Sequence, residues 1–148
     1  MPNLFPTLVG KNLNKQKITI PEDFSNKDII IIIAFQRWHQ PLVDTIITNL
    51  EQINIEDTYH LIEVPVVSQL SIFRRMRLDA IMRAGIRDPQ IRQRTITVYT
   101  DKDEFKQKLE IPNEDEVHWF LVSHSSKEIL SRGSGVISSK EAEIVFLN

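Results

Sequence analysis

The sequence predicts an α/β domain in which a mixed central sheet carries helices on both faces. Three observations lead to this prediction. Residues 29–35 are seven consecutive apolar residues, residues 42–53 carry apolar side chains at helical spacing, and residues 59–67 form a second, largely apolar run. A strand that is covered on both faces has a continuous apolar run instead of an alternating one. Strand, helix and strand in this order predict a right-handed unit with two parallel strands.

Local patterns justify several of the elements in turn. Residues 13–20 alternate and stop at Pro21, so they predict a short strand or hairpin at the edge of the sheet. Pro41 suits the first turn of the helix that follows, because its missing N–H loses no bond there. Acidic residues early in 101–109 favour the start of a short helix. Ser138 and Glu141 suit the N-cap and N3 positions of the last helix.

The other predicted elements follow in chain order. They are a helix from Ser68 to about Ala84 or Gly85, a strand over 95–100, an acidic loop over 112–116 with a solvated run at 114–116, and two strands over 118–123 and 129–132 that a polar turn joins. The pattern contains no internal repeat. We therefore expect residues 1–148 to form a single domain, of the layered α/β class.

Composition excludes several classes of protein. The 148 residues include no cysteine, so a disulfide, a thiolate nucleophile and a cysteine-ligated metal site are impossible. A formal net charge of -2 argues against a nucleic-acid-binding protein. The apolar runs are far shorter than the roughly 20 residues that cross a bilayer, and the first residues lack the pattern of a signal peptide. We expect a cytoplasmic protein with no cofactor, no nucleic-acid partner and no transmembrane segment.

The predicted order and one segment resemble the thioredoxin-like superfamily. The segment is Phe35-Gln36-Arg37-Trp38-His39-Gln40-Pro41-Leu42, where the first buried strand meets the helix. Members of the superfamily carry Trp-Cys-x-Pro-Cys at this junction, and Trp38 and Pro41 stand at the matching positions. The resemblance covers nearly all of residues 4–148 and implies a thioredoxin-like three-layer sandwich. The extra strand–helix unit over 95–109 is similar to that of the peroxiredoxin and TlpA-type branch.

The departures from this superfamily decide what activity the resemblance implies. His39 and Leu42 stand at the two cysteine positions, and Val117 stands where members usually place a cis-proline. Thiol–disulfide exchange and peroxide reduction both need a thiolate, so both are excluded. The arginine-rich segment and the long stretch after the second strand resemble the thioredoxin-like assembly factors of the mitochondrial ATP synthase and their prokaryotic relatives.

His39 is the first candidate functional residue. At the start of a helix, beside Trp38, it suits a ligand-binding or acid–base group whose pKa the helix N-terminus lowers. The alternative is a polar residue that remained after the requirement for cysteine was lost. The resemblance also places His118 near His39, but a metal site needs three or four ligands and no others are evident. We therefore expect no metal.

Residues 68–94 provide the second candidate site. Their cations are seven arginines, against Asp79 and Asp88, which gives this segment a net charge of +5 in an otherwise acidic chain. Arginine makes bidentate contacts with carboxylates and phosphates, and Arg74 and Arg77 fall at or inside the apolar stripe of the predicted helix. The pattern predicts a surface for a protein partner or a small anionic ligand. The alternative is a solvated helix whose arginines pair with acidic groups of the same chain.

Two functions follow from these observations. The favoured one is a non-catalytic thioredoxin-fold module, without thiol redox activity, that binds a protein partner as an assembly or scaffolding factor. The alternative is a small-ligand-binding protein or a non-thiol enzyme that uses the ancestral pocket around His39. The candidate ligand- or partner-binding residues are Arg37, Trp38, His39, Gln40, Pro41, Arg74, Arg75, Arg77 and His118.

Overall fold

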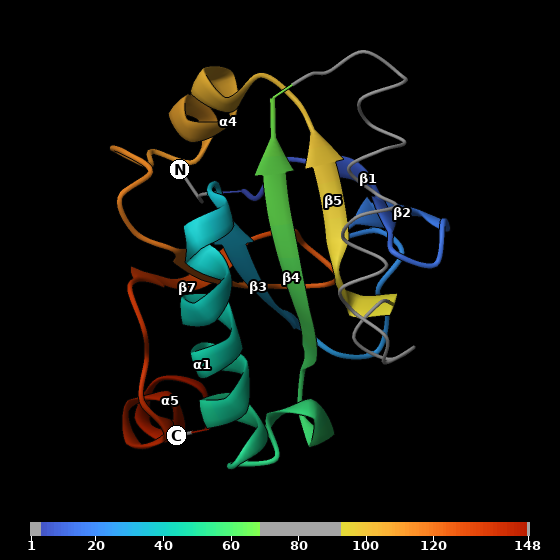
Figure 1. Ribbon diagram of the computed structural model, residues 1–148. Coiled ribbons are helices and arrows are strands. Elements are labelled where there is room, and N and C mark those ends of the chain that lie inside the picture. The colour runs from blue at the N-terminus through green and yellow to red at the C-terminus, as the bar shows by residue number, and fades with distance from the viewer. Residues whose placement is uncertain (1–3, 69–92, 148) are drawn as a thin grey trace.

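The computed structural model describes residues 4–68 and 93–147 and shows a seven-stranded mixed sheet with helices packed on it (Figure 1). The strand order is β2-β1-β5-β4-β3-β6-β7. The strands are β1 (Leu8–Asn12), β2 (Lys17–Ile20), β3 (Ile29–Ala34), β4 (His60–Val67), β5 (Ile96–Tyr99), β6 (His118–Val122) and β7 (Ile129–Ser134). The helices are η1 (Arg37–His39), α1 (Gln40–Glu51), η2 (Ile55–Asp57), α4 (Lys102–Lys108) and α5 (Ser139–Phe146), of which η1 and η2 are 3-10 helices.

The parallel strands β3, β4 and β5 confirm the predicted strand–helix–strand unit. β3 pairs with β4 in parallel register from Ile29 opposite His60 to Ala34 opposite Pro65, and β4 pairs in parallel with β5. Every residue of β3 is buried, as its unbroken apolar run predicts. The carboxyl ends of these three strands meet at one edge of the sheet, called the carboxyl rim below. In open α/β sheets this edge is where ligands usually bind.

Each face of the sheet has its own core. On one face α1 and α5 pack through side chains such as Leu50 and Phe146, and on the other α4 packs through Phe105. The helices on both faces confirm the predicted three-layer arrangement. In the first core, the indole of Trp119 in β6 lies against Gly133 in β7, where an added Cβ would come within 2.3 Å of the indole.

The N-terminal hairpin is confirmed at the edge of the sheet, but the predicted extent of its strand is wrong. Leu13, which the prediction placed in the strand, belongs to the turn between β1 and β2. The side chain of Asn12 builds this turn, because its Oδ1 accepts the backbone N–H groups of Asn14 and Gln16, each at 3.0 Å. Lys15 completes it with a φ of 67°.

The predicted helix starts are confirmed in the described residues. Asp101 Oδ1 accepts the N–H groups of Asp103 and Glu104, and Ser138 Oγ accepts the N–H of Glu141 at 3.1 Å. The predicted helix from Ser68 to Gly85 lies outside the described residues, apart from Ser68 itself. None of the described helices is long and apolar enough to cross a membrane.

Candidate functional site

The segment that resembles the thioredoxin active-site loop lies at the carboxyl rim. It leaves β3 at Phe35, turns through η1 and enters α1 at Gln40, with Pro41 in the first turn of the helix as predicted. Two other segments reach the same rim, since α4 follows the end of β5 and the loop over 112–116 precedes β6. The site is therefore assembled from three parts of the chain.

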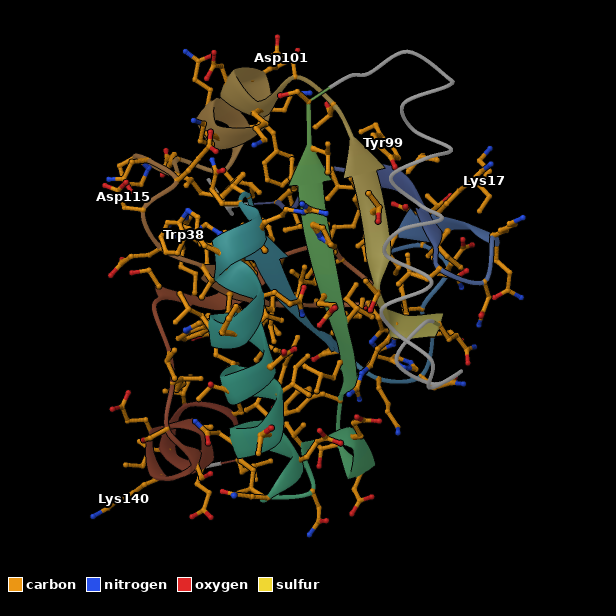
Figure 2. The ribbon with its side chains drawn as sticks, viewed as in Figure 1. Lys17, Trp38, Tyr99, Asp101, Asp115 and Lys140 are labelled. Carbon is orange, nitrogen blue, oxygen red and sulfur yellow. The ribbon has the colours of Figure 1, made fainter. Side chains whose placement is uncertain are left out.

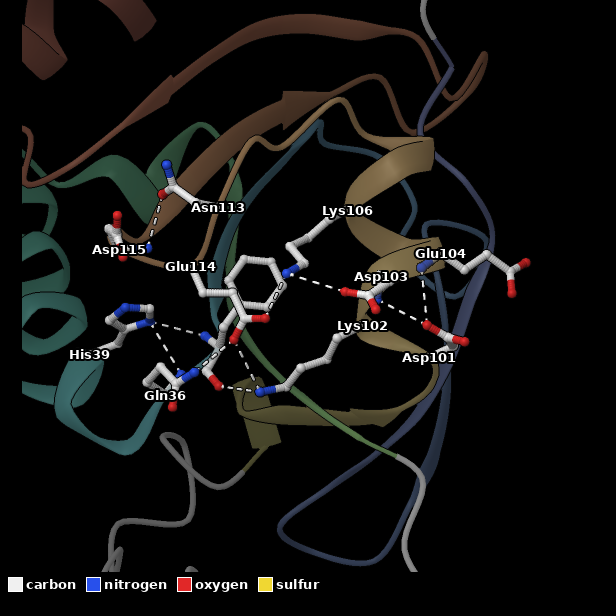
Figure 3. A network of polar contacts seen from close by, with 11 residues as sticks. Gln36, His39, Asp101, Lys102, Asp103, Glu104, Lys106, Asn113, Glu114 and Asp115 are labelled. Atoms are coloured by element: carbon white, nitrogen blue, oxygen red, sulfur yellow. Dashed lines mark hydrogen bonds and ion pairs between the residues drawn. The ribbon is translucent and has the colours of Figure 1, made fainter.

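His39 is buried, with none of its surface exposed. Its Nδ1 accepts the backbone N–H of Phe35 at 3.0 Å and that of Gln36 at 3.3 Å (Figure 3). Because a backbone N–H only donates, Nδ1 carries no proton and the hydrogen of the neutral ring is on Nε2. In this conformation the ring fixes the end of β3 and presents no surface to a ligand.

The pKa of His39 lies below its ordinary value, in the direction that the sequence predicts. Burial is the main cause, because it disfavours the charged imidazolium. The backbone carbonyl and the carboxylate of Glu114 oppose this effect, and the charge of Lys102 adds to it.

Trp38 is the exposed counterpart of His39. Its side chain is 56% exposed, although its ring contacts the His39 ring edge to face with centroids 4.2 Å apart. Figure 2 shows it near the end of α1 where that helix begins. Arg37 and Pro41 on either side are also exposed, whereas Gln40 is half-buried and donates to Asp44 Oδ1 at 2.9 Å.

Glu114 joins the three segments of the rim (Figure 3). Its Oε1 accepts Gln36 Nε2 at 2.7 Å and Lys102 Nζ at 3.3 Å, and its Oε2 accepts Lys106 Nζ at 2.7 Å. Burial raises the pKa of this carboxyl, but the hydrogen bonds from Lys106 and Lys102 outweigh it and hold the pKa below its usual value. The predicted solvated loop is therefore wrong for Glu114, since its side chain is held by three donors. Its neighbour Asp115 is exposed as predicted.

Lys102 strengthens the same junction by donating to the backbone carbonyl of Phe35 at 2.8 Å. Sequence reasoning missed Glu114, Lys102 and Lys106 as parts of the site. The sequence did contain one indication of the two lysines, because Lys102 and Lys106 are four residues apart and therefore share one face of α4.

The structure places His118 at the start of β6, where it is buried against the ring of Phe35 with centroids 6.4 Å apart. Burial is the main cause that lowers its pKa, and the nearby His39 adds to the effect. Both histidines contact Phe35, His39 through the backbone N–H and His118 through the ring, so the two lie near each other as the resemblance implied. The described residues contain no group of three or more side chains that could hold a metal ion.

Glu63 is a buried carboxyl that sequence reasoning did not single out. It lies in the middle of β4, 3% exposed, and accepts the hydroxyl of Thr95 at 2.9 Å. Burial raises its pKa. Its signal in the sequence was a lone acidic residue within an apolar strand.

The arginines of the second candidate site, Arg74, Arg75 and Arg77, lie outside the described residues. The part of the predicted surface that the structure places is the exposed loop around Trp38.

No protein-family model matches this sequence, and no curated protein matches it either. Several solved structures are similar in fold. BsSco, a member of the Sco family of cytochrome c oxidase assembly proteins, superposes with a TM-score of 0.62 at 10% identity, over 98% of this chain and 91% of that one. The exposed lipoprotein thioredoxin of Streptococcus pneumoniae gives 0.60 at 9% identity, over 92% and 94%. A thiol:disulfide interchange protein from Bacteroides sp. gives 0.58 at 12% identity, over 100% and 91%.

These similarities extend over almost the whole of each chain, so they concern the fold as a whole and not a shared fragment. At such low identity they carry no activity from one protein to another. With its seven-stranded mixed sheet, the parallel β3–β4 pair and the loop at the end of β3, this chain without cysteine has a thioredoxin-like fold.

Proposed function

We propose that this protein is a binding module of thioredoxin-like fold, without thiol redox activity, that recognises a protein partner through the exposed loop around Trp38. An assembly role is the favoured form of this function. This role is supported by the similarity to BsSco, whose family consists of assembly proteins. The absence of any cysteine supports the part of the proposal that excludes thiol redox activity.

The observation that carries the proposal is the exposure of Trp38 on a fixed loop. An aromatic side chain buries about 150–250 Å² when it is covered, and tryptophan is enriched among the residues that dominate binding energies. His39 beneath the loop and Glu114 beside it hold the backbone of Phe35 and the side chain of Gln36. A partner would therefore meet a surface that is already ordered, which reduces the entropy lost on binding.

Site-specific photo-crosslinking tests this proposal in a lysate of the native host. p-Benzoylphenylalanine is introduced at Trp38 in one variant and at Ile144 in a second, matched variant. Ile144 is similarly exposed, at 58%, but lies on α5. That helix packs against the far end of α1, where Ser139 Oγ donates to the Asn49 carbonyl at 2.8 Å. We expect a protein that is crosslinked from position 38 and not from position 144.

Affinity then separates specific binding from chance proximity. For the partner so identified, Trp38→Ala should weaken binding by about 30-fold, the effect of losing a contact worth about 2 kcal/mol. Ile144→Ala should leave it unchanged. The proposal is wrong if positions 38 and 144 crosslink the same proteins, or if Trp38→Ala binds the partner as tightly as the wild type.

A further inference from the structure

A cavity of about 320 Å³ lies at the opposite edge of the sheet from Trp38. Its described lining comes from the segment before β3 (Phe24, Lys27), from η2 and the start of β4 (Glu56, His60), and from the residues just before β5 (Gln93, Arg94). Ligand pockets in proteins begin at roughly 300 Å³. The volume therefore suits a small molecule and not a peptide.

Among the described residues that line this cavity, one cation forms no ion pair. Arg94 is paired already, because its guanidinium contacts the carboxylate of Glu56 at 2.5 Å and that of Glu51 at 3.8 Å. Lys27 donates to the backbone carbonyl of Glu56 at 2.8 Å, and within residues 4–68 and 93–147 no carboxylate forms an ion pair with it. An ammonium group has three N–H donors, so Lys27 has two donors left for a ligand.

The rest of the cavity combines an aromatic wall with a buried floor. The rings of Phe24 and His60 contact each other with centroids 5.3 Å apart. His60 Nε2 lies 2.9 Å from the carbonyl oxygen of Ser25, and a carbonyl only accepts, so Nε2 carries a hydrogen and Nδ1 is the nitrogen left for a ligand. Leu61 and Ile62 are buried beneath. The aromatic wall at Phe24 suits the flat, apolar body of a small molecule, while the rest of the exposed lining is mostly polar.

We infer that this cavity binds a small organic monocarboxylate, whose carboxylate pairs with the ammonium of Lys27 and whose apolar body lies against Phe24. One negative charge matches the one cation that forms no ion pair among the described lining residues. A phosphate monoester, with nearly two negative charges at neutral pH, would place its excess charge beside the carboxylate of Glu56. The inference does not depend on the function proposed for the Trp38 loop.

The test uses benzoate as the probe and follows backbone amide resonances of the ¹⁵N-labelled protein. We expect benzoate to shift the amides of Phe24, Lys27 and His60 in a saturable manner. Benzamide, its neutral counterpart, and phenyl phosphate should each bind more weakly. Lys27→Met keeps the unbranched side chain up to the position of Cε and removes the charged ammonium group. It should weaken benzoate binding about tenfold, as expected for losing a charged hydrogen bond. Lys17→Met, at an exposed lysine of β2, should leave the affinity unchanged.

Several results would overturn the inference. Benzoate shifts that do not saturate, or that fall outside the cavity, would exclude a site there. Equal affinity for benzoate and benzamide would exclude recognition of the charge, and this comparison needs no variant at all. Tighter binding of phenyl phosphate would replace the carboxylate class with phosphate. Unchanged benzoate affinity in Lys27→Met would exclude the role assigned to the ammonium group.

Discussion

Replacing His39 with leucine tests the structural role of the ring at the carboxyl rim. Leucine fills much of the same buried space but offers no acceptor to the N–H groups of Phe35 and Gln36. Phe35 is only 4% exposed, so its N–H cannot form a hydrogen bond to water instead. Gln36 lies at the surface, where its N–H can. A buried donor without an acceptor costs about 1–3 kcal/mol. We therefore expect His39→Leu to lower the free energy of unfolding by about 2 kcal/mol, nearly all of it through Phe35.

Urea denaturation followed by far-ultraviolet circular dichroism measures this loss, and a thermal melt should show a fall in Tm of about 4–8 °C. His39→Asn is the matched variant, because its Oδ1 can take the place of Nδ1 and accept the same N–H. It should lose less than half as much stability as the leucine variant. The reasoning is refuted if His39→Leu is as stable as the wild type, or if both variants lose the same amount.

Three further predictions concern titratable groups. The pKa values of His39 and His118 are lowered in the folded chain, so the unfolded chain takes up protons first and stability should fall as the pH drops below about 6.5. Urea midpoints at pH 7.5 and 5.5 measure this fall, and His39→Asn should make the difference between the two midpoints smaller. The pKa of Glu63 is raised, so stability should fall as the pH rises above the ordinary carboxyl value. Glu63→Gln keeps the acceptor for Thr95 and should therefore be more stable than the wild type at pH 8 but not at pH 4; an equal difference at both would contradict the buried carboxyl's role. Glu114→Gln should cost about 1 kcal/mol by weakening its bonds to Lys102 and Lys106. The cost measured by urea denaturation should shrink in 1 M NaCl, where charges interact over a range about three times shorter than at 0.1 M.

Much of the fold was predictable because its strongest signals are local. The apolar run of β3 and the helical spacing of α1 each lie within one short stretch of sequence. The first is buried as a strand covered on both faces, and the second as a helix with one face against the sheet. The caps at Asp101 and Ser138 were predictable for the same reason. The hairpin boundary was missed although its signal was also local, since Asn12 is a common turn-forming residue type whose side chain bonds the backbone two residues on.

The candidate site was less predictable because its contacts join distant parts of the chain. Glu114 accepts from Gln36, 78 positions away, and from Lys102, 12 positions away. Nothing within the acidic stretch 114–116 separates the residue that is held from those that are solvated. The role of His39 was likewise hidden, because an acceptor for backbone N–H groups needs no particular sequence context.

The contact between Trp119 and Gly133 bears on how this chain could be recognised among distant relatives. Because any side chain at position 133 would meet the indole at 2.3 Å, and packed interiors leave no room for such an overlap, the two positions cannot change independently. A homologue that keeps tryptophan at position 119 must keep glycine opposite it, and one with a larger residue at position 133 must carry a smaller one at 119. This paired constraint gives a marker for relatives whose overall identity has fallen to the level of chance.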